Sequence, residues 1–168
     1  MELPFCEICL KTGMLCPGCT AKIKDGELSD NDLEIAKELY RLSQENKGLK
    51  DVKFKRSIKV GNLIIILIEA GEIGSIIGKG GNVIRGLSKK LNKKIRVIEE
   101  SKDVKKVAAD LLYPAKVYGI NIVYMPDGTI IKRLRLGKEF ERKLPIATKS
   151  VKEILLLVTG ENVDIVFE

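Results

Sequence analysis

The sequence predicts a mixed α/β protein of the α+β class, in which a small cysteine-rich unit precedes two copies of one α-β-β-α-α-β unit. Three observations lead to this fold. All four cysteines lie near the N-terminus, at or before Cys19, helical and strand-like apolar patterns alternate through the remainder of the chain, and that order of patterns occurs twice. We therefore expect a cysteine unit at 1–24, a first copy at 30–100 and a second copy at 101–168.

The first copy is predicted to begin with a helix over 30–46. Ser29 and Asp32 have the spacing of a capping box, and apolar residues then recur at helical intervals. A hairpin follows, in which a loosely alternating strand over 52–60 precedes the apolar run 63–68. The same patterns place the rest of the unit: a short helical stretch over 73–77, a second helix after Gly81 and a strand over 95–98.

The second copy repeats this order. Ser101 can cap a helix that ends before Tyr113-Pro114, and Pro126-Asp127-Gly128 forms the turn of a hairpin. The apolar patterns predict the other elements: strands over 117–125 and 129–136, a short helix over 138–144, a longer helix striped by Val151, Ile154, Leu155 and Val158, and a final strand over 163–167.

A glycine-rich loop, Gly78-Lys79-Gly80-Gly81, separates two predicted helices of the first copy and fits the pattern I-G-x-x-G-x-x-I. Glycine lets the backbone approach a ligand closely, and the N-terminus of the following helix offers unpaired N–H groups and a positive dipole. Both features favour the binding of a phosphate group at this loop. When Val83 is aligned with Val151, the second copy has Ile146-Ala147-Thr148-Lys149 at the place of the loop. We therefore expect a phosphate clamp in the first copy and a degenerate loop in the second.

The charge distribution also indicates a polyanionic ligand at this loop. The chain has a net charge of +7, and residues 79–106 alone carry 10 basic and 3 acidic residues, which equals the whole surplus. Basic charge that is concentrated in one stretch is typical of nucleic-acid binding, whereas evenly spread charge mainly affects solubility.

The loop motif within this helix-first order resembles the type II KH domain, a nucleic-acid-binding fold. Two such units joined by a helix and the run Leu111–Val117 resemble the tandem KH module of NusA, and in particular short archaeal NusA-like proteins. The resemblance implies a non-catalytic protein that binds single-stranded RNA, such as a nascent transcript, during transcription elongation or termination, with RNA polymerase as a partner. Two alternatives remain: a component of ribosome-associated or RNA-processing machinery, and a protein-interaction scaffold.

The resemblance and the loop chemistry together select the residues expected to contact RNA. They are Ile77, Gly78, Lys79, Gly80, Gly81, Asn82, Ile84, Arg85 and Lys89. The bases are expected to lie along an apolar groove. We assign that groove to Ile76, Ile77, Val83, Ile84, Ile95 and Val97.

The cysteines form two CxxC pairs, Cys6/Cys9 and Cys16/Cys19, which predict one structural zinc ion. Four thiolates satisfy tetrahedral zinc, and each pair can form a knuckle or part of a zinc ribbon. Disulfides or free thiols and an iron–sulfur cluster are the alternatives. The short gap between the pairs suggests a narrow hairpin through Lys11–Met14. A unit of this size lacks a core of its own, so we expect the metal to supply its folding energy.

Other classes of function are disfavoured. The chain has no histidine and no readable nucleophile–base pair, which argues against an enzyme with a small-molecule substrate. The loop lacks the G-x-G-x-x-G of dinucleotide sites, and Gly80 follows Lys79 where a P-loop has Ser or Thr. The longest apolar run, Leu63–Ile68, is short and no signal sequence is visible, so we expect a cytoplasmic protein without a membrane span.

Overall fold

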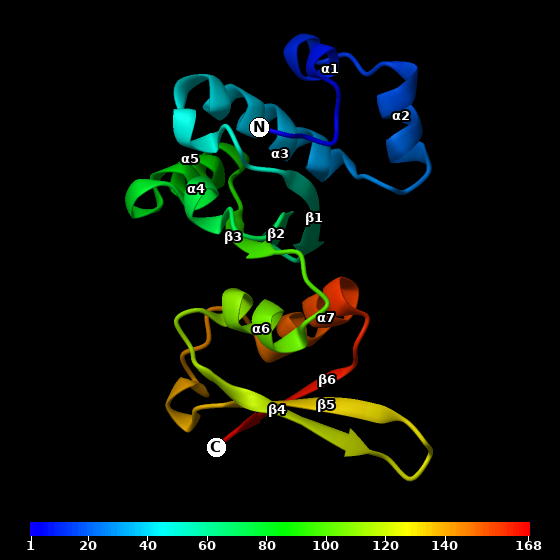
Figure 1. The fold of residues 1–168 in the computed structure, drawn as a ribbon, viewed down its shortest axis with the longest axis vertical. Coiled ribbons are helices and arrows are strands. Elements are labelled where there is room, and N and C mark those ends of the chain that lie inside the picture. The colour runs from blue at the N-terminus through cyan, green and yellow to red at the C-terminus, as the bar shows by residue number, and fades with distance from the viewer. The chain divides into compact units, whose positions relative to one another are not determined.

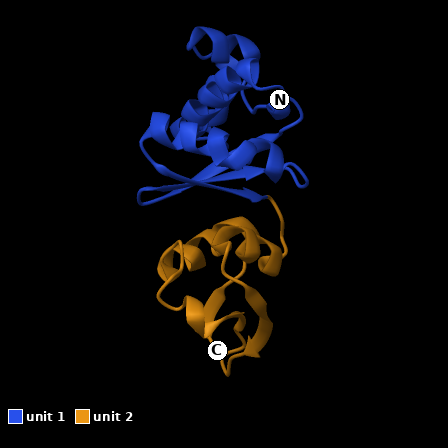
Figure 2. Ribbon diagram, turned by 90° about the vertical axis from the view of Figure 1, so that its left-hand side faces the viewer, with its two compact units in different colours: residues 1–99 blue, residues 100–168 orange.

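The computed structural model describes all 168 residues and divides into two compact units, Met1–Glu99 (unit 1) and Glu100–Glu168 (unit 2) (Figures 1 and 2). Each unit contains one three-stranded sheet, with strand orders β1-β2-β3 and β4-β5-β6. The mixed α/β class and the repeated unit predicted from the sequence are confirmed. No helix in the structure combines the length and apolar character that a membrane crossing requires.

Unit 1 contains the cysteine segment and the first copy of the repeated unit. Its elements in chain order are α1 (Glu7–Thr12), α2 (Pro17–Lys24), α3 (Asp30–Glu45), the 3-10 helix η1 (Lys47–Leu49), β1 (Phe54–Val60), β2 (Leu63–Ile68), α4 (Ile73–Ile77), the 3-10 helix η2 (Lys79–Gly81), α5 (Asn82–Leu91) and β3 (Lys94–Glu99).

The sheet of unit 1 buries one face against α3, α4 and α5 (Figure 1). β2 pairs with β1 in antiparallel and with β3 in parallel orientation. Alternate residues of β2, such as Ile64 and Ile66, pack with Ile35 and Leu39 of α3 and with Leu87 of α5 in the buried core. This packing fixes the position of the α4–α5 loop at one edge of the unit.

Asp32 joins α3 to the sheet. The capping box predicted for Ser29 and Asp32 is present, and the same carboxylate accepts hydrogen bonds from the backbone N–H and hydroxyl of Ser57 on β1, at 2.6 and 2.5 Å. The Asp32 residue is only 2% exposed. A buried carboxylate with several donors both starts the helix and holds it on the first strand.

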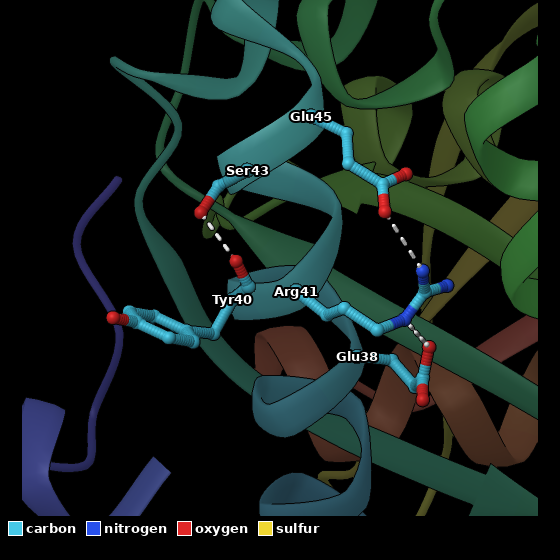
Figure 3. A network of polar contacts seen from close by, with 5 residues as sticks. All are labelled: Glu38, Tyr40, Arg41, Ser43 and Glu45. Atoms are coloured by element: carbon cyan, nitrogen blue, oxygen red, sulfur yellow. Dashed lines mark hydrogen bonds and ion pairs between the residues drawn. The ribbon is translucent and has the colours of Figure 1, made fainter. Parts of the chain in front are cut away.

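The exposed side of α3 carries a small ion-pair network. Arg41 contacts Glu38 at 3.1 Å and Glu45 at 3.3 Å, and the Ser43 hydroxyl donates to the backbone carbonyl of Tyr40 (Figure 3). The ion pairs have the spacing at which side chains on one helix face meet. The Tyr40 hydroxyl donates to Glu7 of α1 at 3.1 Å and so connects α3 to the cysteine segment.

The cysteine segment is helical and differs from the narrow hairpin expected between its pairs. Cys6 and Cys16 immediately precede α1 and α2, and Pro17 occupies the first position of α2, where proline is favoured. Gly13 ends α1 in a left-handed conformation. Because the helices have only 6 and 8 residues, their apolar periodicity was too short to predict them.

The cysteine segment shares the core of unit 1. Phe5, Cys9, Leu10 and Cys19 are buried in one cluster with Ile35 and Leu39 of α3. The segment 1–24 therefore buries apolar side chains against the rest of the unit, in addition to any metal it holds.

Unit 2 has the same topology with a different loop. Its elements are α6 (Val104–Leu112), β4 (Val117–Tyr124), β5 (Ile130–Leu136), the 3-10 helix η3 (Lys138–Phe140), α7 (Thr148–Thr159) and β6 (Val163–Phe167). The parallel register agrees with the sequence alignment of the two copies, because Ile64 pairs with Ile95 in unit 1 and the equivalent Lys132 pairs with Val163 in unit 2.

Two local predictions for unit 2 are wrong. The helix expected over 138–144 is the three-residue η3 followed by turns, and Pro145 disfavours helical backbone at the residue before it. The cap of α6 is Asp103, whose carboxylate accepts from the Lys105 N–H, whereas Ser101 accepts from the Asp103 N–H before the helix begins.

Candidate nucleic-acid interface and metal centre

The loop between α4 and α5 depends on three glycines with positive φ. Gly78 ends α4 at φ 77° and ψ 177°, a region open essentially to glycine alone, and Gly80 and Gly81 follow at φ 59° and 75°. Between them Lys79 is exposed. The chain thus turns sharply into the N-terminus of α5 with the loop backbone at the surface.

The glycines of this loop have different steric roles. A Cβ on Gly78 would lie 2.6 Å from Cγ2 of Val83 and would also collide with Asn82. Gly81 has no atom within 4 Å of such a position, and the nearest atom to a Gly80 Cβ is Nη2 of Arg85 at 4.0 Å. Gly78 is therefore needed for packing of the turn, while Gly80 and Gly81 leave open space above the backbone.

This difference predicts unequal costs for alanine substitutions. Gly78→Ala should lower the free energy of unfolding by about 2–4 kcal/mol, because it adds a collision to a strained φ/ψ region. Gly81→Ala should cost only about 1–2 kcal/mol, the ordinary penalty for left-handed backbone. Urea denaturation of both variants measures the difference. Equal losses would contradict the assignment of Gly78 to the packed side of the turn.

Most residues predicted to bind RNA are accessible along the end of α4, the loop and α5. Arg85 reaches back toward Gly80, and Lys89 follows one turn later on α5. The exposed residues are Ile77, Lys79, Gly80, Asn82, Arg85 and Lys89, and the half-buried ones are Gly78, Gly81 and Ile84.

The apolar groove expected beside the loop is smaller than predicted. Ile76, Val83 and Val97 are 0%, 5% and 7% exposed and belong to the core. Val83 and Val97 lie on the element faces that pack together between helix and sheet, so most of their surface is taken up by core packing. Only Ile77, Ile84 and Ile95 of that set keep accessible surface.

A hollow of about 440 Å³ also adjoins the loop, on the side of η1. Asn46 and Gly48 contribute to its wall together with Ser75, Gly78 and Lys79. Sequence reasoning did not include Asn46 and Gly48, because the whole β1–β2 hairpin separates them from the loop along the chain and neither lies in a motif.

The four cysteine side chains meet at one point. The sulfur atoms all lie within 4.8 Å of one another, with Cys6 Sγ 3.2 Å from that of Cys9 and 3.9 Å from that of Cys16. Tetrahedral zinc with bonds of about 2.3 Å would hold its sulfur ligands about 3.8 Å apart. The cluster has the number, type and spacing of donor atoms that a tetrahedral metal ion requires.

Backbone N–H groups support the sulfur atoms as expected for knuckles. The N–H groups of Cys16, Cys19 and Cys6 donate to Sγ of Cys9, Cys16 and Cys19, at 3.1, 3.4 and 3.4 Å. Such donors stabilise thiolates, the form in which cysteine binds metal.

The thiols of the metal-free cluster differ in acidity. The Cys9 N–H lowers the pKa of Cys6, and the Cys19 N–H lowers the pKa of Cys16 to about 6. The N–H of Cys16 also favours the thiolate of Cys9, but the Cys6 thiol and burial outweigh it and raise the pKa of Cys9 to about 12. The Cys6 N–H likewise favours the thiolate of Cys19, but burial and the neighbouring thiols outweigh it, so the pKa of Cys19 is raised.

Comparison with known proteins identifies the loop-bearing part of the chain. Residues 30–100 match the family model described as the NusA-like first KH domain. This part of the chain is similar to the first KH domain of NusA-like proteins. It contains the complete α3-to-β3 unit, including the loop Gly78–Gly81, and the KH resemblance noted in the sequence is confirmed.

Two archaeal proteins and one solved structure are similar to the chain. It is 30% identical over 95 residues to a probable transcription termination protein NusA of Methanococcus vannielii, an alignment that covers 50% of this chain and 55% of that protein. The corresponding protein of Methanocaldococcus jannaschii is 27% identical over 110 residues, which cover 59% and 60% of the two chains. The chain thus spans little more than half the length of these relatives.

The structural comparison supports the fold. The crystal structure of APE1850 superposes with a TM-score of 0.57 and 24% sequence identity, and covers 77% of this chain and 95% of that one. The second KH-like unit differs from the first at its loop. Ile146 is 6% exposed, α7 begins at Thr148, and none of residues 146–149 has a positive φ.

Proposed function

We propose that this chain is a non-catalytic protein that binds single-stranded RNA through its NusA-like KH domain and acts on transcripts during elongation or termination. The observation that carries the proposal is the open glycine loop, which leads into a helix whose accessible charged side chains are all basic. In this proposal residues 30–100 bind RNA, 1–24 hold a metal and 101–168 form the second KH unit.

The chemistry of the loop suits a phosphate chain. Gly80 and Gly81 carry no side chain that would keep a sugar-phosphate backbone away, and the positive end of the α5 helix dipole follows them directly. Lys79, Arg85 and Lys89 add positive charge along the same track. Ile77 and Ile84 offer apolar contacts to bases. Such loops clamp about four nucleotides in KH domains.

We further propose that Cys6, Cys9, Cys16 and Cys19 bind one structural Zn²⁺. All four tetrahedral positions would be filled by thiolates, so no position would remain for a substrate, and the ion would serve folding only. Elemental analysis of the purified protein should give about one zinc per chain. Iron in place of zinc, or four thiols that react freely without a chelator, would overturn the assignment.

The double variant Lys79→Asp/Gly80→Asp tests the RNA site. It should abolish binding of a fluorescent single-stranded RNA in an anisotropy titration, because two carboxylates would lie where phosphate is expected. Aspartate tolerates left-handed backbone better than most residues, so the fold should survive. Lys24→Asp/Gly26→Asp is the matched control: it makes the same charge change at an exposed lysine and a glycine with φ 76°.

The control should bind RNA with nearly unchanged affinity. If the Lys79/Gly80 variant keeps both its stability and its affinity, the loop is not the RNA site. Salt dependence gives a second measurement, because each neutralised phosphate of a single strand contributes about −0.7 to the slope of log K against log salt. A flat dependence would contradict phosphate binding.

The role in transcription is supported by the family match and by the names of the two archaeal relatives. Affinity purification of the chain from its own cells distinguishes this role from the alternatives. RNA polymerase subunits among the recovered proteins are the expected result. Ribosomal subunits or exonuclease components without polymerase would favour the RNA-processing role.

A further inference from the structure

The segment of unit 2 that corresponds to the RNA-binding track of unit 1 has lost its positive net charge. The shared strand register, in which Ile95 of unit 1 corresponds to Val163 of unit 2, shows which positions are structurally equivalent. Residues 79–96 carry seven basic and no acidic side chains, a net charge of +7. The equivalent residues 147–164 carry two basic and three acidic side chains, a net charge of −1.

Individual replacements show how this loss of positive charge arises. Arg85 and Arg96 of unit 1 correspond to acidic residues, Glu153 and Asp164, in unit 2. Lys89 corresponds to Leu157, which is 51% exposed. A phosphate chain gains most of its affinity from cations, so this segment, which keeps only Lys149 and Lys152, has lost most of the charge that would bind RNA.

A groove of about 590 Å³ lies along this segment, between α7 and the first residues of β5 and β6. Leu156 on α7 lines it and is 45% exposed, opposite Ile131 and Val163. Further apolar side chains are exposed on the β4–β5 hairpin of the same unit: Ile122, Tyr124, Met125 and Ile130.

Four charged residues line the groove: Lys152 and Asp164 pair with each other, whereas Lys149 and Glu153 form no ion pair, and of these two Glu153 lies nearer to Leu156 along α7. Lys152 contacts Asp164 at 2.9 Å, and outside the groove Lys132 contacts Glu161 at 3.3 Å. Glu153 lines the groove, is exposed and makes no ion pair. Its carboxylate lies one turn of α7 before Leu156, so an apolar ligand in the groove that carries a cation would complement both residues.

From these observations we propose that the α7–β5–β6 groove of unit 2 binds a segment of a partner protein that carries apolar side chains and a lysine or arginine. Leu156 and Ile131 take the apolar side chains, and Glu153 pairs with the cation. The second unit then contributes protein docking, while RNA contact is the task of the first. The proposal does not depend on RNA binding by unit 1.

A phage-displayed library of random peptides, panned on the full-length zinc-loaded chain, supplies the probe. Enriched peptides should contain apolar residues together with lysine or arginine. Leu156→Asp and Glu153→Arg should each weaken the binding of an enriched synthetic peptide at least about tenfold. Both residues are exposed, so the fold should be retained. Glu141→Arg, the same charge change at an exposed site outside the groove, is the matched control and should leave affinity unchanged.

The outcomes separate the possibilities. A library that yields no binder, or peptides that bind both groove variants as tightly as the unchanged chain, overturns the proposal. Amide NMR spectra with single-stranded RNA of mixed sequence provide the other arm. If the amide signals of Glu153 and Leu156 shift and saturate at the same RNA concentration as that of Gly80, the groove is an RNA site and not a protein site. If RNA shifts amide signals of unit 1 only, or shifts no signals, the groove does not bind RNA and the protein-docking proposal stands.

Discussion

Chelation of the metal is expected to unfold the cysteine segment and to lower the stability of the whole of unit 1. A structural zinc site supplies on the order of 10 kcal/mol of apparent binding free energy, and folding depends on it in small metal-binding units. Cys9 and Cys19 are themselves buried beside Ile35 and Leu39 of α3. Loss of the site should therefore expose one face of α3 in addition to disordering residues 1–24.

The structure changes what the sequence alone would predict for this experiment. From the sequence, the segment 1–24 lacks a core, so metal loss should affect these residues only. Because Phe5 and Leu10 are buried in the core of unit 1, we now expect the melting temperature of the unit to fall by at least about 10 °C. Differential scanning calorimetry with and without chelator measures this, and Cys9→Ser should reproduce the chelated state.

Unit 2 is the internal control for metal removal, because it has its own sheet and buried side chains. Its amide NMR signals should persist when those of residues 1–24 disappear. Met14→Ala, at a side chain 77% exposed between the two cysteine pairs, should leave both zinc content and stability unchanged. If chelation releases one zinc ion without any loss of structure, the metal has no structural role.

Metal affinity should also depend on pH in a defined direction. Cys16 has a pKa of about 6 and that of Cys6 is lowered, whereas the pKa values of Cys9 and Cys19 are raised. Zinc binding near neutral pH should therefore release at least about two protons, including those of Cys9 and Cys19. Affinity should fall as the pH decreases, and more steeply below about 6, where Cys16 also becomes protonated. Calorimetric titrations in buffers of different ionisation enthalpy count these protons.

Sequence patterns predicted the elements whose signals are long or chemically specific. The helix from Asp30 has a capping box and an apolar stripe over its 16 residues, and the loop Gly78–Gly81 needs backbone conformations that only glycine adopts readily. Both were found where expected. The helix α1, with 6 residues, is too short for periodicity to distinguish it from a turn.

The predicted groove shows a second limit of sequence reasoning. Apolar residues near a functional loop can either pack inside or meet the ligand, and their type does not distinguish these roles. Val97 points to the core because β3 pairs with β2 in a register that sets it beside Ile66. Contacts between distant segments, such as the wall that Asn46 contributes beside Gly78, also leave no local signal in the chain.

Asp32 illustrates the same limit at a residue whose local role was predicted correctly. The capping box follows from Ser29 and Asp32 alone, but the bonds to Ser57 arise only when α3 packs on β1. We expect Asp32→Ala to lower the free energy of unfolding by about 3 kcal/mol, because the N–H groups of Ser29 and Ser57 would both lose the buried carboxylate that accepts from them.

Chemical denaturation of three variants tests this expectation. Asp30→Ala, at an exposed carboxylate in the same helical turn, should cost less than about 1 kcal/mol, since it removes only a favourable interaction with the helix dipole. The loss of unfolding free energy for Asp32→Asn should lie between those of the two alanine variants. An amide keeps one oxygen acceptor but turns its NH₂ group toward a donor. If Asp32→Ala costs no more than Asp30→Ala, then Asp32 acts as an ordinary helix cap, and the attachment of α3 to the sheet comes from apolar packing alone.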